Sequence, residues 1–551
     1  MNGRLFYMGL WVILLLISLS AAQDLRPQKS SPSTQPAQSR PKIPIIVSRE
    51  TTYLTGPLNA DGTVNYVAAI NEMASKGVTP EDNAAIPLIQ SKGDIILEPE
   101  MTPLKDNFYK TVGMTIPTGD RRYVALRDYL KNHDRDALVR IRKLFPPILR
   151  DGLDEGDLPL SDDPAIASWL KFNDGHFTLL ARAARRDRYF VPLISSSDPP
   201  TMCDTFKIGI CLPHVAPIRA LGYRARLRLK SGDTAGAFED AVTLGRLGRM
   251  KPQNLMGFLV LASHLSQAAS VDEAFARTPD LSTVQLKECL SRIEVLSANE
   301  RLAEVLDQGE RLVALDILVM SSREGLVGFN RFKHELLHKM GQPACHINIP
   351  EVAIDWNVVL KLENKYFDDL VWAARLPLYS ARVKALEKLC LGNSQAKPIK
   401  PIPEDSENTF GFTATCLEMK TLLEKMKDRN PQEVGAAVWQ QVMPIGIDLS
   451  RTLKGVTEQV QVKQELARVA LALRLYNWET GRYPEILNVL VPSILKKVPV
   501  DPFSDKPLHY ARSGKGFILY SVGPDMKDDG GKEKDPKQSG FDGYDIVLRV
   551  E

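Results

Sequence analysis

The chain has 551 residues, of which 44% are hydrophobic and 25% are charged, and this is the composition of an ordinary globular protein. Its net charge of +3 is spread along the sequence, whereas a nucleic-acid interface needs a concentrated basic patch. We therefore expect no nucleic-acid partner, and a chain of this length has room for several domains.

The first 22 residues have the three parts of a secretory signal. Arg4 provides a positive start, residues 5–22 form a mostly apolar run, and the run ends in Ser20-Ala21-Ala22, where a signal peptidase requires small residues. Eighteen residues also reach the lower limit of a membrane span. Cleavage and retention as a membrane anchor therefore both stay open, and either outcome places the rest of the chain in the periplasm or cell envelope.

Residues 23–45 are rich in proline, serine and glutamine and contain few large apolar side chains. Such a segment cannot bury enough apolar surface to offset the entropy of ordering. We expect a disordered tether here.

A helical period dominates residues 46–390. Leu221, Ala225 and Leu229 recur every four residues, a Ser-Gly-Asp turn follows at 231–233, and a second apolar stripe begins at Ala237. This pattern predicts a helix–turn–helix pair with arginine-rich outer faces. No fixed repeat length follows from it, so we predict an irregular helical array, with further helices at 122–145, 165–186, 254–276, 282–320, 330–340 and 355–389.

One motif in this region suggests a metal site. His334-Glu335-Leu336-Leu337-His338 matches H-E-x-x-H, in which two histidines on one helix face bind zinc and the glutamate activates a water molecule. The next histidine, His346, stands five residues after Gly341, whereas the extended motif requires three. An exposed helix face with two histidines by chance explains the pattern as well, so zinc ligation by His334 and His338 is an alternative hypothesis only.

Residues 391–450 are predicted to form a linker and connecting helices, and residues 451–551 an α+β domain. Val462, Leu466, Val469 and Leu473 form the apolar stripe of one long helix, which ends near Gly481. Residues 517–521 and 545–550 have the composition of strands. A helix packed against a small antiparallel sheet covers the apolar face of each.

Several motifs in this last region occur in a recognisable order: Ala-Leu-Arg-Leu-Tyr at 472–476, Thr-Gly-Arg-Tyr-Pro at 480–484, Val-Pro-Val-Asp-Pro-Phe at 498–503, Tyr-Ser-Val-Gly-Pro-Asp at 520–525, and Asp-Ile at 545–546. Over about 95 residues, the segment resembles the head domain of the type II secretion major pseudopilin. The family's N-terminal processing site is absent, so the resemblance does not imply polymerisation into a pseudopilus.

The resemblance also implies a calcium ion near the C-terminus, with Asp525 and Asp545 among its ligands. Tyr544 stands where the family has a second adjacent aspartate. Asp528, Asp529 or Asp542, from the long intervening loop, would then supply the missing oxygen, since calcium takes several oxygen ligands from flexible loops. A solvated acidic loop without a metal is the alternative.

These observations together predict an exported, non-enzymatic protein of the bacterial envelope, in which a helical scaffold binds protein partners and carries a pseudopilin-like head. A zinc-dependent hydrolase is the first alternative. The second is a helical protein that binds a small envelope ligand, and this would require a deep apolar pocket in the helical region.

Overall fold

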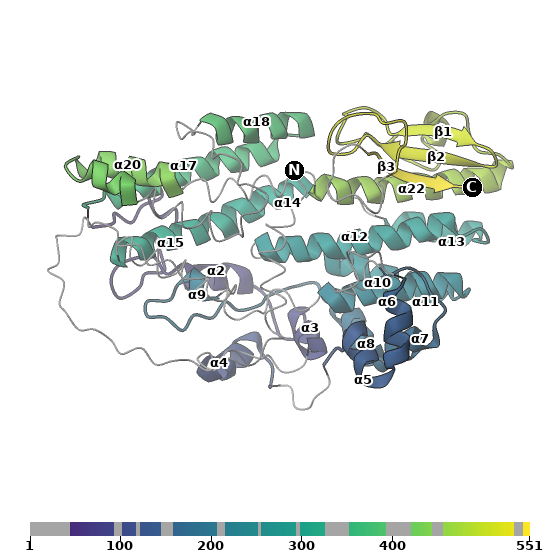
Figure 1. The fold of residues 1–551 in the computed structure, drawn as a ribbon, viewed down its shortest axis with the longest axis horizontal. Coiled ribbons are helices and arrows are strands. Elements are labelled where there is room, and N and C mark those ends of the chain that lie inside the picture. The colour runs from purple at the N-terminus through teal and green to yellow at the C-terminus, as the bar shows by residue number, and fades with distance from the viewer. Residues whose placement is uncertain are drawn as a thin grey trace.

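The computed structural model describes residues 44–92, 102–116, 122–144, 158–205, 215–251, 255–293, 298–324, 352–392, 420–442, 456–533 and 544–551. The protein is mostly helical, with a three-stranded antiparallel sheet near the C-terminus, as predicted (Figure 1). In the described ranges, no helix is both long enough and apolar enough to cross a membrane.

The longest helices are stacked in layers. Helix α12 (Leu255–Arg277) lies between a pair of helices, α10 (Val215–Lys230) and α11 (Thr234–Gly248), and helix α22 (Val456–Thr480) (Figure 1). Helix α13 (Thr283–Arg292) continues beside α22. One hydrophobic core runs through these layers.

The predicted helix–turn–helix pair is present as α10 and α11. Gly232 adopts φ +85° in the turn, a backbone conformation that glycine adopts without a steric cost. Asp233 caps α11, because its carboxylate accepts a hydrogen bond from the amide of Gly236 at 2.9 Å.

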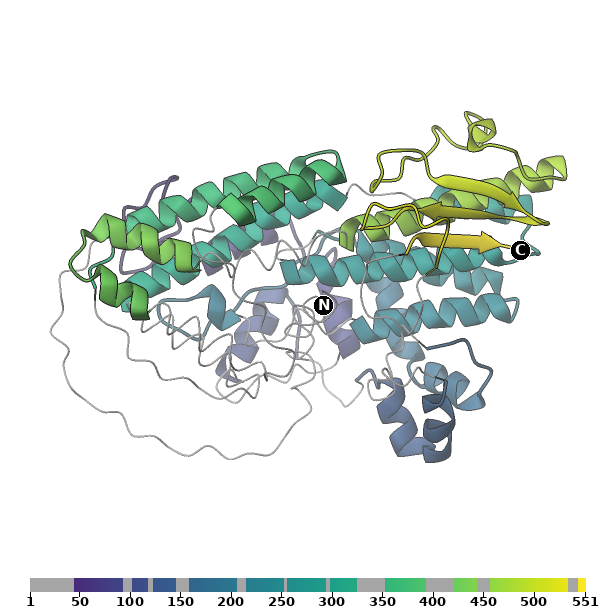
Figure 2. The same cartoon turned by 45° about the horizontal axis from the view of Figure 1, so that its top comes forward.

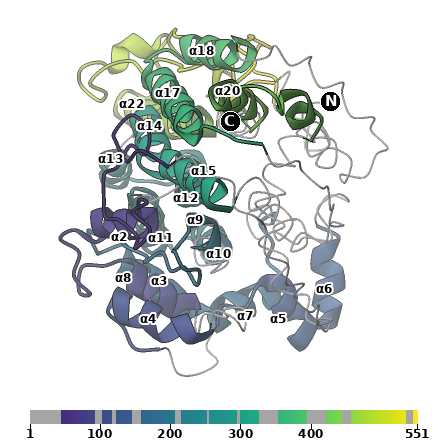
Figure 3. The same ribbon diagram turned by 90° about the vertical axis from the view of Figure 1, so that its left-hand side faces the viewer.

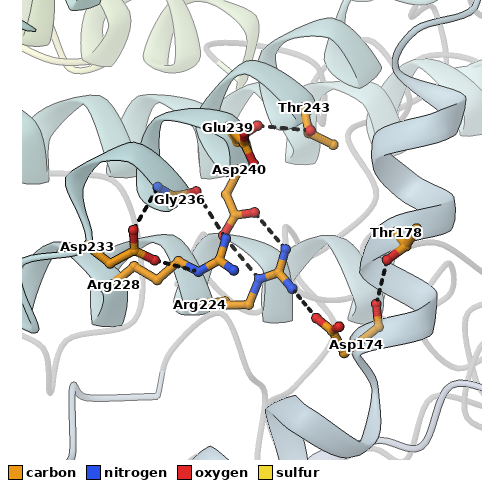
Figure 4. A network of polar contacts seen from close by, with 9 residues as sticks. All are labelled: Asp174, Thr178, Arg224, Arg228, Asp233, Gly236, Glu239, Asp240 and Thr243. Carbon is orange, nitrogen blue, oxygen red and sulfur yellow. Dashed lines mark hydrogen bonds and ion pairs between the residues drawn. The ribbon is translucent and has the colours of Figure 1, made fainter.

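The arginines of this pair are less exposed than the sequence predicted. Arg224 and Arg228 of α10 both bind the buried carboxylate of Asp240 on α11, at 2.7 and 2.9 Å (Figure 4). Arg224 also reaches Asp174, at the start of α8. The face that we predicted as solvated therefore joins three helices through one buried carboxylate.

A second hydrophobic core lies beside the first. Leu315, Val359, Leu360 and Val438 are among its fully buried residues. It is built around α15 (Arg311–Glu324), α17 (Trp356–Arg375) and α20 (Pro431–Val442), and α18 (Tyr379–Gly392) packs on α17. The remaining elements of this part are α2 (Tyr66–Ser75), α9 (Met202–Thr205), α14 (Ala298–Val305) and a π-helical turn (Leu306–Glu310).

Shorter helices form the edge of the molecule opposite α18 (Figure 3). They are α3 (Ala85–Lys92), α4 (Thr102–Val112), α5 (Leu126–His133), α6 (Arg135–Arg142), α7 (Pro164–Phe172) and α8 (Asp174–Ala183).

The predicted helix at 254–276 agrees with α12 to within one residue, but other predicted helices are interrupted. The helix predicted at 122–145 ends at His133, and Asp134 caps a new helix through the amide of Ala137. The helix predicted at 165–186 breaks at Asn173. The segments predicted at 282–320 and 355–389 are likewise divided, and the helix predicted at 330–340 lies outside the described residues.

The C-terminal region contains α22, a short 3₁₀ turn (Leu487–Leu490) and the strands β1 (His509–Ser513), β2 (Gly516–Ser521) and β3 (Ile546–Val550). The strands pair antiparallel in the order β1-β2-β3, with Leu519 opposite Tyr510 and Leu548. Strands β2 and β3 match the predicted ones to within one residue, whereas β1 was not predicted as a strand.

The sheet covers one side of α22, and α12 covers the other (Figure 2). Ala470, Leu471, Ala472 and Leu473 are all fully buried, so α22 is buried around its whole circumference here. The C-terminal helix and sheet thus share the core of α10 to α13.

Candidate functional site

The loop after β2 returns to β3 through a set of backbone contacts centred on Asp545. This residue is almost fully buried at the start of β3. Its carboxylate accepts hydrogen bonds from the amide of Gly531 at 2.6 Å and of Asp529 at 3.3 Å, and its own amide donates to the carbonyl of Lys532 at 2.9 Å. Asp545 therefore organises the loop at 529–532.

Asp528 lies on the same loop. Its Oδ1 atom accepts hydrogen bonds from the amide of Gly530 at 2.9 Å and from the hydroxyl of Tyr520 at 3.1 Å, while its Oδ2 atom is 3.6 Å from Nδ1 of His509. The hydrogen bond from Gly530 lowers the pKa of Asp528, because it stabilises the charged form.

The two carboxylates differ in electrostatic environment. Burial raises the pKa of Asp545 in spite of its amide donors, and the neighbouring charge of Asp528 raises it further. A cation placed between these groups would offset both effects, because its positive charge stabilises both carboxylates.

The described residues supply only part of a calcium site. Asp525 accepts a hydrogen bond from the amide of Lys527 at 3.2 Å, and Asp542 lies outside the described residues. Among the residues that the structure describes, no group of three or more histidine, cysteine, aspartate or glutamate side chains is arranged to hold a metal ion. Calcium takes six to eight oxygen ligands, so Asp525, Asp528 and Asp545 would need further ligands.

The residues of the H-E-x-x-H motif, His334, Glu335 and His338, also lie outside the described residues. Zinc ligation by His334 and His338 stays a prediction.

One residue of structural importance was missed as a functional candidate. Asp501 is completely buried, and its carboxylate accepts hydrogen bonds from the amide of Phe503 at 3.0 Å, the hydroxyl of Ser521 at 2.8 Å and the amide of Val522 at 3.0 Å. It thereby fixes the 498–508 loop to the end of β2. The sequence signal was an aspartate set between valine and proline in the 498–503 motif.

The structure also assembles a group of basic side chains that the sequence did not reveal. A hollow of about 1060 Å³ lies where α11, α12, α13, α22 and residues 494–497 meet. Its basic residues include Arg246 and Arg292 from the helical array and Lys496 and Lys497 from the C-terminal region. Arg246 and Lys497 are 251 positions apart in the chain, so no local pattern could have identified them.

Comparison with protein-family models, with curated proteins and with solved structures finds no match to this chain.

Proposed function

We propose that this chain is an exported, non-enzymatic protein of the bacterial envelope, in which a helical scaffold binds protein partners and carries a pseudopilin-like C-terminal unit. The C-terminal region supports this proposal best. One long helix is followed by a small antiparallel sheet, which is the arrangement that the resemblance to the pseudopilin head implies. Because the unit shares the core of the helical array, it would be held rigidly by the scaffold.

Export is supported by the apolar run at residues 5–22 and is tested by cell fractionation. We expect the full chain in the periplasmic or membrane fraction, and Leu14→Arg with Leu15→Arg should retain it in the cytoplasm, because charges in the apolar run oppose insertion. Leu14→Ile with Leu15→Ile is the matched control. A cytoplasmic wild type would overturn the proposed location.

The scaffold function is tested by photo-crosslinking in living cells. Trp478, on α22, is 63% exposed, so a photoreactive residue there would meet a partner of the C-terminal unit. We expect a discrete adduct with another protein, and no such adduct from Phe172 on α7, which is also exposed. Equal labelling at both positions would contradict a partner site on the C-terminal unit.

Calcium binding is a separate part of the proposal. We expect calcium to raise the melting temperature of the full chain, and Asp525→Ala to abolish the increase without lowering the melting temperature in chelator. The reason is that Asp525 is proposed as a ligand, whereas Asp545 also holds the loop through its amide bonds. An identical melting temperature with and without calcium would remove the calcium site.

Two alternative functions have different support. A zinc hydrolase would require stoichiometric zinc in the purified chain and the loss of this zinc in His338→Ala. Metal analysis of both proteins decides this.

A protein that binds a small ligand is favoured by one observation, the hollow of about 1060 Å³ between α11, α13 and α22. This hollow has a basic lining and differs from the deep apolar pocket that this alternative would require.

A further inference from the structure

The hollow between the helical array and the C-terminal region has the size of a small-molecule site. Its volume is about 1060 Å³, just above the range of about 300–1000 Å³ that is typical of ligand pockets. Residues of helices α11, α12, α13 and α22 and residues 494–497 line it.

The charge of the lining is strongly unbalanced. Six basic side chains face two acidic ones, so the formal surplus is four positive charges. The acidic residues are Asp272 and Glu465, and the basic residues are Arg246, Arg249, Arg292, Arg468, Lys496 and Lys497.

Both carboxylates form ion pairs with arginines of the same lining. Arg292 lies 2.6 Å from Asp272, with its guanidinium over the ring of Phe275, and Arg468 lies 2.6 Å from Glu465. Two of the six basic residues are therefore neutralised within the lining.

The C-terminal ends of two helices offset a further part of the positive charge. Helix α11 ends at Gly248 and α13 at Arg292, and Arg249 donates a hydrogen bond to the carbonyl of Arg292 at 3.1 Å. Each helix C-terminus is equivalent to roughly half a negative charge. Together they offset about one of the four surplus charges, which leaves the described lining with a net surplus of about three positive charges.

We propose that this hollow binds a small molecule that carries a phosphate or diphosphate group and an apolar portion. Guanidinium groups hold phosphate oxygens in a bidentate geometry, and lysine adds a point charge. Arg246, Lys496 and Lys497 are exposed at the rim, where they meet an incoming anion. Leu290 and Ile494 supply apolar contact within the same lining. The inference rests on the ligand-binding alternative above and is independent of export and of the C-terminal resemblance.

The test uses pyrophosphate as a soluble probe and phosphatidylglycerol vesicles as a lipid probe, with the full chain in both arms. Lys496→Gln with Lys497→Gln should weaken binding about tenfold or more, because charge-assisted hydrogen bonds to phosphate are lost. Lys131→Gln with Lys143→Gln removes the same charge from exposed positions outside the hollow. This control should bind like the wild type. Both pairs are exposed, and matching thermal melting curves will confirm that they fold.

A soluble phosphorylated ligand is supported if the wild type binds pyrophosphate and only the variant Lys496→Gln with Lys497→Gln loses this binding. Binding of vesicles alone, with the same loss, supports a lipid headgroup. The proposal is overturned by an absence of binding to both probes, or by an equal loss in the two variants, which would indicate a non-specific charge effect. Phosphatidylcholine vesicles, which carry no net charge, should not bind in any case.

Discussion

At the scale of single residues, Asp501 shows how a buried carboxyl group is satisfied by hydrogen bonds from its own loop and from the end of β2. Its oxygens accept bonds from the amides of Phe503 and Val522 and from the hydroxyl of Ser521, and a further hydroxyl, that of Ser504, lies at 3.2 Å. Hydrogen bonds to a charged group stabilise a fold more than neutral ones do. The 498–503 motif therefore has a structural role that does not depend on a bound metal.

We predict that Asp501→Asn lowers the free energy of unfolding by about 2–3 kcal/mol. The amide keeps the shape of the side chain but replaces one accepting oxygen with a donor that faces other donors. Urea unfolding of the full chain measures the change. Asp505→Asn is the control, because Asp505 is exposed and its φ of +58° is a conformation that asparagine tolerates. Equal destabilisation by both substitutions would contradict the assigned role.

At the scale of elements, the sequence predicted those parts in which local pattern and tertiary packing agree. Helix α12, the α10–α11 pair and strands β2 and β3 were all expected near their observed bounds. Strand β1 was missed because its last three residues are exposed, so it has no apolar alternation. The breaks at Asp134 and Asn173 were missed because the apolar period continues across them while the backbone does not.

Features that depend on distant segments could not be predicted in this way. We interpreted α22 as a helix with one apolar face, but the consecutive apolar residues at 470–473 indicate burial on all sides. The basic hollow joins residues of α11 to Lys496 and Lys497, and no periodicity connects such positions. Of the predicted calcium ligands, the structure describes Asp525, Asp528 and Asp545 but not Asp542.

A buried ion pair connects α18 with α22. Arg382 lies 2.7 Å from Glu458, and both side chains are about 5% exposed or less. We predict that Arg382→Met lowers the free energy of unfolding by about 3–5 kcal/mol, because it removes the positive charge that pairs with a buried carboxylate.

The double variant Arg382→Met with Glu458→Leu should recover most of this loss, since an apolar pair needs no charge compensation. Urea unfolding of the two single variants and the double variant measures the coupling. A double variant as unstable as the sum of the single ones would show that the pair itself is not the source of the effect.

At the scale of the whole molecule, two carboxyl groups, Asp316 and Glu363, connect stability with pH. Burial raises the pKa of Asp316 to about 7 and that of Glu363 to about 7. Asp316 accepts a hydrogen bond from the amide of Met202 at 2.6 Å, and Glu363 accepts one from Nε1 of Trp439 at 2.8 Å. In the folded protein, both groups therefore keep their protons at pH values where the unfolded chain releases them.

This difference in bound protons gives the direction of the pH dependence. Between the ordinary carboxyl pKa, near 4, and the folded value of about 7, the folded state binds more protons than the unfolded state. The contribution of Asp316 to the free energy of unfolding consequently falls as the pH rises through that window, and it no longer changes above about pH 7. The buried His264, whose pKa burial lowers to about 3, acts in the opposite direction, so the total pH profile does not isolate either effect.

A comparison of wild type with Asp316→Asn isolates the contribution of Asp316, because His264 is present in both proteins. Asparagine stays neutral and can still accept the hydrogen bond from Met202, so the two proteins should have similar stability near pH 4. At pH 8, the wild type must hold a buried carboxylate, and we predict that Asp316→Asn is then the more stable protein. Urea unfolding at both pH values measures the difference, with Asp505→Asn as the exposed control. If the gap between wild type and Asp316→Asn does not widen with pH, Asp316 has the same pKa in the folded and unfolded states, and the proposed proton linkage is wrong.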